Sequence, residues 1–105
     1  DLLELASSFF EDENLPLQTT SDFNEALSLL KNNTYDLVIT DAKMPTGSGY
    51  DLIKFLRNDS SYKGKIILAT GSLQEAGDNI GYDIVVQKPI DFLQLIDTVK
   101  SMLNI

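Results

Sequence analysis

Tyr35-Asp-Leu-Val-Ile-Thr40, with Asp41 directly after it, is the stretch that decides the fold. Its compact run of branched and apolar residues is typical of a β-strand covered on both faces, as the strands of a parallel sheet are. The run places Asp41 at the carboxyl end of the predicted strand. Because ligands bind beyond the carboxyl ends of the strands in an open parallel sheet, Asp41 is the first candidate functional residue.

The rest of the chain predicts a regular alternation of helices and strands. Helices are expected at residues 2–14, 23–30, 48–56 and 92–102, and further strands at 15–19, 65–69 and 82–86. Two helices open with a capping box, Asp22 with Glu25 and Ser48 with Asp51. Residues 72–81 are expected to hold only a stunted helix, because glycine, aspartate and asparagine follow so soon after its start. This alternation, with short connections, predicts an α/β fold in which helices cover both faces of a doubly wound parallel sheet.

The composition limits the class of protein. A chain of 105 residues without a linker or repeat predicts one globular domain over residues 1–105. A net charge of -8 argues against direct nucleic-acid binding by this segment. The absence of cysteine and histidine excludes zinc enzymes and Ser-His or Cys-His hydrolases within the chain. No apolar run approaches the roughly 20 residues that span a bilayer, and no signal peptide is recognisable, so we expect a soluble, cytoplasmic protein.

Three polar residues fall at or just after the carboxyl ends of three predicted strands: Asp41, Thr70 and Lys88. Each alone has an ordinary structural explanation, as a cap, a turn former or a solvated loop lysine. In a doubly wound sheet these strand ends converge on one crevice, and together the three residues suit an anion such as phosphate. A carboxylate can attack phosphorus and form an acyl phosphate, while a hydroxyl and an ammonium hold the phosphoryl oxygens.

These residues form part of a longer ordered pattern. It consists of Asp36-Leu-Val-Ile-Thr-Asp41, then Met44-Pro45 and Gly49, then Thr70-Gly71, then Lys88-Pro89-Ile90. The pattern resembles the receiver domain of two-component response regulators and hybrid histidine kinases, over essentially all 105 residues. The resemblance implies a flavodoxin-like fold and a signalling module, whose catalysis is limited to its own phosphotransfer and dephosphorylation. Its implied partners are a sensor histidine kinase or phosphotransfer domain and an effector domain or partner protein.

The resemblance also implies a role for each site residue. Asp41 would accept the phosphoryl group, Thr70 would be the switch hydroxyl, and Lys88 would contact the phosphoryl group. The amide of Gly71 would approach the phosphoryl oxygens. The carboxylate of Asp41 and the backbone carbonyl of Lys43 would bind Mg²⁺. The Lys88-Pro89 peptide is expected to be cis.

The chain departs from the family pattern at its start. The family begins with a hydrophobic strand, central in the sheet, that ends in an acidic pair holding Mg²⁺, whereas this chain starts at Asp1, just before its first helix. We therefore expect the sequence to be a crop of a longer polypeptide, or another segment to fill the place of that strand. Without the acidic pair, magnesium binding and phosphorylation of this exact segment are in doubt. A second departure is Val85, where the family often carries an aromatic residue.

Two alternatives remain open from the sequence. The first is a pseudo-receiver, which keeps the fold and acts as an interaction module without phosphorylation; the missing acidic pair is its main support. The second is a small flavodoxin-like enzyme or nucleotide binder that uses the same crevice. The absence of a glycine-rich loop such as G-x-x-x-x-G-K counts against the second alternative.

Overall fold

The computed structural model describes residues 20, 22–44, 47–59, 62–72 and 81–105. It divides into two compact units, one of residues 21–90 and one of residues 1–20 with 91–105. The predicted helix at 2–14 and strand at 15–19 lie outside the described residues, as does most of the stunted helix predicted at 72–81. The prediction of one domain over residues 1–105 stays a prediction.

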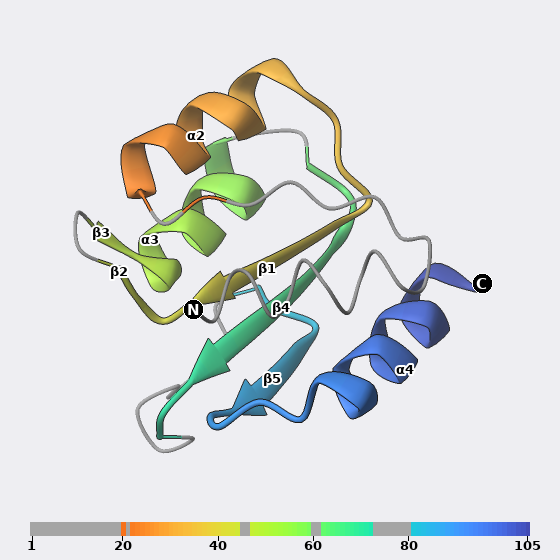
Figure 1. The fold of residues 1–105 in the computed structure, drawn as a ribbon. Coiled ribbons are helices and arrows are strands. Elements are labelled where there is room, and N and C mark those ends of the chain that lie inside the picture. Colours follow the sequence, from red (N-terminus) through yellow and green to blue (C-terminus); the bar gives the residue numbers. More distant parts are fainter. Residues whose placement is uncertain (1–19, 21, 45–46, 60–61, 73–80) are drawn as a thin grey trace. The chain divides into compact units, whose positions relative to one another are not determined.

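A three-stranded parallel sheet forms the centre of the larger unit (Figure 1). Its strands lie in the order β1 (Leu37–Asp41), β4 (Lys65–Thr70) and β5 (Ile84–Gln87). The middle strand, β4, is buried from its second residue to its last, which explains its continuous apolar run. In register, Asp41 pairs with Ala69, and Thr70 pairs with Gln87. The carboxyl ends of all three strands therefore meet at the same edge of the sheet.

Two helices of this unit begin at the predicted capping boxes. The Asp22 carboxylate accepts a hydrogen bond from the Glu25 amide at 2.9 Å and caps α2 (Phe23–Asn32). The Ser48 hydroxyl accepts one from the Asp51 amide at 3.1 Å and caps α3 (Gly49–Lys54). A short polar side chain at this position satisfies an amide that would otherwise lack an intrahelical partner. Both predicted helix starts are confirmed.

One hydrophobic cluster joins α3 and the segment after it to the sheet. Its buried members are Ala42, Ile53, Leu56, Ile66 and Leu68. Leu30 of α2 and Val38 of β1 pack against this cluster, so α2 and α3 lie on the same face of the sheet, as Figure 1 shows. Alternate residues of β1 therefore face these helices.

Two local features were not predicted. A short antiparallel ladder joins β2 (Lys43–Met44) and β3 (Gly47–Ser48). The helix α3 continues as a π-helical segment, η1 (Phe55–Asp59). Two-residue strands are too short to show a period in the sequence, and a π-helical turn keeps much of the helical apolar spacing.

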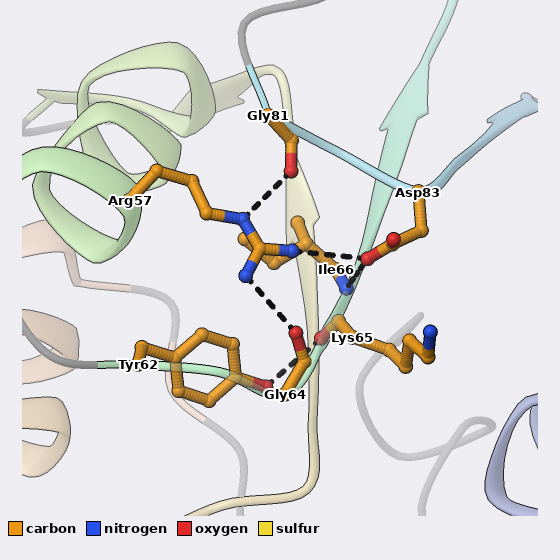
Figure 2. Close-up of polar contacts among 7 residues, drawn as sticks. All are labelled: Arg57, Tyr62, Gly64, Lys65, Ile66, Gly81 and Asp83. Carbon is orange, nitrogen blue, oxygen red and sulfur yellow. Dashed lines mark hydrogen bonds and ion pairs between the residues drawn. The ribbon is translucent and has the colours of Figure 1, made fainter.

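A network of hydrogen bonds and one ion pair around Arg57 links the amino ends of β4 and β5 (Figure 2). Arg57 of η1 donates to the carbonyl oxygens of Gly81 at 2.9 Å and Gly64 at 3.1 Å, and its Nη2 lies 3.0 Å from Asp83 Oδ2. The same Asp83 oxygen accepts the Ile66 amide at 2.8 Å. Because the side chain of Asp83 occupies that amide, the ladder of β5 starts at Ile84, two residues after the predicted start at residue 82.

The smaller unit contains α4 (Phe92–Leu103). Asp91 caps its start by accepting the Gln94 amide at 3.2 Å, and Asn104, in the left-handed conformation, ends it. The helix was predicted at residues 92–102, and its buried face carries Leu95, Ile96 and Val99. Within the described part of the chain, no helix is long and apolar enough to cross a bilayer.

Candidate functional site

The sheet brings Asp41 and Lys88 into direct contact. Asp41 is the last residue of β1, and Lys88 follows the end of β5, across the middle strand β4. The Nζ atom of Lys88 lies 2.8 Å from Oδ1 of Asp41. The two side chains are 36% and 38% exposed, so a small reactant in solvent can reach the pair. The predicted convergence of these two residues at one edge of the sheet is observed.

Backbone hydrogen bonds extend the ladder past both strand ends and hold the pair in place. The amide of Lys88 donates to the carbonyl of Thr70 at 2.8 Å, and the amide of Ala42 donates to the carbonyl of Ala69 at 2.8 Å. Lys88 and Ala42, the residue after Asp41, are thus both bonded to the buried middle strand. The Lys88-Pro89 peptide is cis, which confirms that prediction.

Thr70 is placed at the same edge, but its hydroxyl is engaged elsewhere. The residue is buried, with 2% of its surface exposed. Its Oγ1 donates to the carbonyl of Ser72 at 3.1 Å and accepts the Ser72 amide at 3.2 Å. Among the described residues, the hydroxyl therefore closes a turn with Ser72. A role as a switch requires it to leave this turn.

Gly71 and Lys43 are placed beside the site by the backbone. Gly71 follows Thr70 and is exposed, and a Cβ added to it would meet no atom within 4 Å. Lys43 lies in β2, two residues after Asp41, and pairs with Ser48. Their predicted roles, the amide of Gly71 for phosphoryl oxygens and the carbonyl of Lys43 for Mg²⁺, stay predictions.

The described residues offer part of a magnesium site. Mg²⁺ takes oxygen ligands, and it commonly binds one or two carboxylates together with waters and substrate phosphates. Asp41 supplies one carboxylate, whose Oδ1 pairs with Lys88. Within the part of the chain that the structure describes, no group of three acidic or histidine residues could hold a metal. The single carboxylate of Asp41 could bind Mg²⁺ only together with phosphate, water or other oxygens that complete the coordination.

Two residues beside Asp41 were not given a role from the sequence. A Cβ on Gly49 would overlap the carbonyl oxygen of Asp41 and lie 2.8 Å from its carbonyl carbon. The hydroxyl of Thr40, which is buried, donates to the same carbonyl oxygen at 3.1 Å. Both residues belong to the quoted motif, but within it Thr40 looked like an ordinary strand residue. The sequence feature that could have identified Thr40 is its polar side chain at a position that alternates with the apolar residues Val38 and Ala42.

The chain matches a known protein family over nearly its whole length. The family model of the response regulator receiver domain matches residues 1–100, and the chain belongs to this family. The chain is therefore a signalling domain of the two-component type, as the sequence pattern predicted.

Individual relatives and solved structures agree with this assignment. The response regulator SaeR of Staphylococcus aureus is 29% identical over 108 residues, which cover 99% of this chain and 46% of the relative. The chain thus spans about half the length of that curated relative. The receiver domain of Francisella response regulator 1452 is 26% identical, with a TM-score of 0.87 over 96% of this chain and 86% of that one. The response regulator TrrA of Thermotoga maritima, solved in complex with Mg²⁺-BeF, is 31% identical, with a TM-score of 0.83 over 94% of this chain and 87% of that one. The predicted flavodoxin-like α/β fold class is confirmed.

Proposed function

We propose that the chain is an active phosphoacceptor, in which Asp41 takes a phosphoryl group from a phosphohistidine on a sensor kinase or phosphotransfer domain. The observation that carries the proposal is the 2.8 Å contact between Lys88 Nζ and Asp41 Oδ1 at the accessible edge of the sheet. It puts a nucleophile and a fixed positive charge side by side, where a phosphoryl group can reach both. Membership of the receiver family supports the same chemistry.

The transfer step needs few groups from the protein. A carboxylate oxygen of Asp41 attacks the phosphorus, a new P–O bond forms, and the P–N bond to the donor histidine breaks. The electron pair leaves with the imidazole nitrogen, which then takes a proton from solvent. The product is an acyl phosphate on Asp41. The ammonium of Lys88 is placed to stabilise the negative charge on the phosphoryl oxygens during transfer.

Magnesium completes this chemistry in the proposal. The relative TrrA was solved with Mg²⁺-BeF. In this chain, the Asp41 carboxylate and the Lys43 carbonyl would hold the ion. When bound, Mg²⁺ supplies charge neutralisation between the carboxylate and the incoming phosphoryl group, which would otherwise repel each other.

Phosphorylation would act as a switch through Thr70. The hydroxyl must give up its turn with Ser72 to bind a phosphoryl oxygen. Each neutral hydrogen bond lost costs about 1 kcal/mol, whereas a bond to a charged oxygen contributes about 1.5–3 kcal/mol. Reversing a 99 to 1 preference requires about 5.5 kcal/mol, so Thr70 needs help from Lys88 and Mg²⁺. The output, an effector domain or partner protein, would read the changed surface.

Intact mass measurement tests the proposal. The full-length protein is incubated with acetyl phosphate and Mg²⁺, beside Asp41→Asn and the control Asp36→Asn, an exposed aspartate just before β1. We expect one added phosphoryl group in the wild type and in Asp36→Asn, and none in Asp41→Asn. A folded wild-type protein that gains no mass contradicts the proposal and supports the pseudo-receiver alternative.

A further inference from the structure

A buried hydroxyl interrupts an apolar row directly before the candidate phosphoacceptor. Val38 and Thr40 point to the same face of the sheet because side chains alternate along a strand, and Ala42, just after β1, lies in the core against which Val38 packs. Val38 and Ala42 belong to the core that contains Ile53 of α3. Thr40 is 3% exposed, so its hydroxyl is buried among apolar neighbours. Burying a hydroxyl is unfavourable unless it forms a hydrogen bond, and a valine would fill the same space without that requirement.

The hydroxyl of Thr40 finds its partner on Asp41 itself. Its Oγ1 donates to the backbone carbonyl oxygen of Asp41 at 3.1 Å. The same carbonyl faces Gly49, the first residue of α3, where any Cβ would overlap it. The position of that absent Cβ is 3.1 Å from Thr40 Oγ1. The carbonyl of Asp41 is therefore tightly packed between the Thr40 hydroxyl and the first residue of α3.

The peptide that follows Asp41 is held on both sides. The amide of Ala42 donates to Ala69 in β4 at 2.8 Å, and the carbonyl of Ala42 accepts the Gly49 amide at 3.0 Å. With the Thr40 bond added, the carbonyl of Asp41 and both polar groups of Ala42 have a fixed partner. These contacts fix the backbone torsion of Asp41 and hence the direction in which its carboxylate leaves the chain.

We propose that Thr40 is a positioning residue for Asp41, whose buried hydroxyl holds the Asp41 carbonyl so that the carboxylate faces Lys88. The inference rests on the proposed function of Asp41 as phosphoacceptor. If the carbonyl turned, the Asp41 side chain and the following Lys43 carbonyl would both shift. Transfer reactions are sensitive to such shifts, because a displacement of about 1 Å can cost on the order of a hundredfold in rate.

Matched substitutions separate the hydroxyl from the space that it fills. Thr40→Val keeps the shape of the side chain and removes the hydrogen bond, whereas Thr40→Ser keeps the hydroxyl. The exposed Thr34, which precedes β1, provides the control Thr34→Val. Phosphorylation of each full-length variant is followed against acetyl phosphate concentration, with thermal unfolding recorded in parallel.

We expect Thr40→Val to change the limiting rate of phosphorylation but not the half-saturating concentration of acetyl phosphate. Loss of one hydrogen bond, about 1 kcal/mol, predicts a fivefold to tenfold fall in the limiting rate of Thr40→Val, with an unchanged half-saturating concentration. Thr40→Ser is expected to recover most of that rate, and Thr34→Val to match the wild type. A wild-type limiting rate in Thr40→Val overturns the proposal, as does an equal loss in Thr40→Ser, which would assign the effect to packing.

A second measurement does not depend on phosphorylation. The carboxyl ¹³C resonance of Asp41 reports its contact with Lys88, and we expect it to shift in Thr40→Val and not in Thr40→Ser. An Asp41 resonance that is the same in Thr40→Val and wild type refutes the positioning role. If the wild type accepts no phosphoryl group while the resonance shifts as expected, the proposed function fails and the positioning of Asp41 by Thr40 stands.

Discussion

Replacing Arg57 by methionine should destabilise the protein substantially, because one side chain links three backbone segments. The guanidinium bonds to Gly81, Gly64 and Asp83, which belong to the segments that lead into β4 and β5 (Figure 2). The Arg57 stem packs against Gly81, where an added Cβ would lie 2.6 Å from Arg57 Cγ, and methionine keeps an apolar stem at this place. The substitution therefore removes the polar contacts and largely preserves the packing.

The magnitude follows from the exposure of each contact. The ion pair with Asp83 is partly solvated, with side chains 24% and 34% exposed, so it contributes about 1 kcal/mol or less. The two bonds to carbonyl oxygens are charge-assisted but only partly buried, so each contributes about 1 kcal/mol, below the 1.5–3 kcal/mol typical of hydrogen bonds to charged groups. We expect a net loss of about 2–3 kcal/mol in the free energy of unfolding for Arg57→Met.

Urea unfolding followed by circular dichroism measures this loss as a lower midpoint at an unchanged slope. Arg57→Lys should lose about 1–2 kcal/mol, because its single ammonium cannot reach three separated acceptors. Asp83→Asn should lose less than about 1 kcal/mol, because its amide oxygen still accepts the Ile66 amide. An Arg57→Met protein within about 0.5 kcal/mol of the wild type would refute this account of the network.

Three further predictions concern the site and the network. Lys88→Met should slow phosphorylation by acetyl phosphate by about tenfold to a hundredfold, because a charge-assisted contact is lost. The free energy of unfolding should change by less than about 1 kcal/mol. Equal phosphorylation rates in the variant and the wild type would contradict the role of Lys88. Gly49→Ala should lower the free energy of unfolding by about 2 kcal/mol or more, because the added Cβ would overlap the Asp41 carbonyl. Gly71→Ala, whose Cβ would meet open space, should change it by less than about 0.5 kcal/mol. Equal losses for the two variants in a denaturant titration would be inconsistent with this geometry. Burial raises the pKa of Tyr62 from 10.0 to about 12. The folded state therefore holds this proton more tightly, so the stabilisation is complete below pH 10 and declines as the pH rises toward 12. Tyr62→Phe should flatten the decline measured by unfolding between pH 9.5 and 11.5, and an identical decline would oppose this assignment.

The sequence predicted the fold where the signals are local and strong. Ser48 with Asp51 and Asp22 with Glu25 marked two helix starts, because a cap is a contact between residues three positions apart. The strands of the parallel sheet were visible as compact apolar runs, and β4 is buried from its second residue to its last. The ladder between β2 and β3 was not predicted because two-residue strands are too short to show a period, and the π-helical segment was missed because it keeps much of the helical spacing. The arginine network was not predicted because its contacts join segments that are distant in the sequence.

The candidate site was predicted from topology more than from any single residue. Asp41 and Lys88 were expected to meet because the carboxyl ends of parallel strands share one edge, and they lie 2.8 Å apart. The engagement of Thr70 by Ser72 could not be read from the sequence, since a hydroxyl has several possible partners within a turn. The contact of Thr40 with the Asp41 carbonyl depends on which side of β1 meets α3, which only the packed structure reveals.

Chemical trapping of the phosphorylated residue tests the central claim most directly. The full-length protein is treated with acetyl phosphate and Mg²⁺, reduced with borohydride, which converts an aspartyl phosphate to homoserine, and mapped by peptide mass spectrometry. The account predicts homoserine at position 41 and at no other aspartate. Homoserine at a different aspartate, or an unmodified residue 41 in protein shown to be folded, would contradict the assignment of Asp41 as the phosphoacceptor.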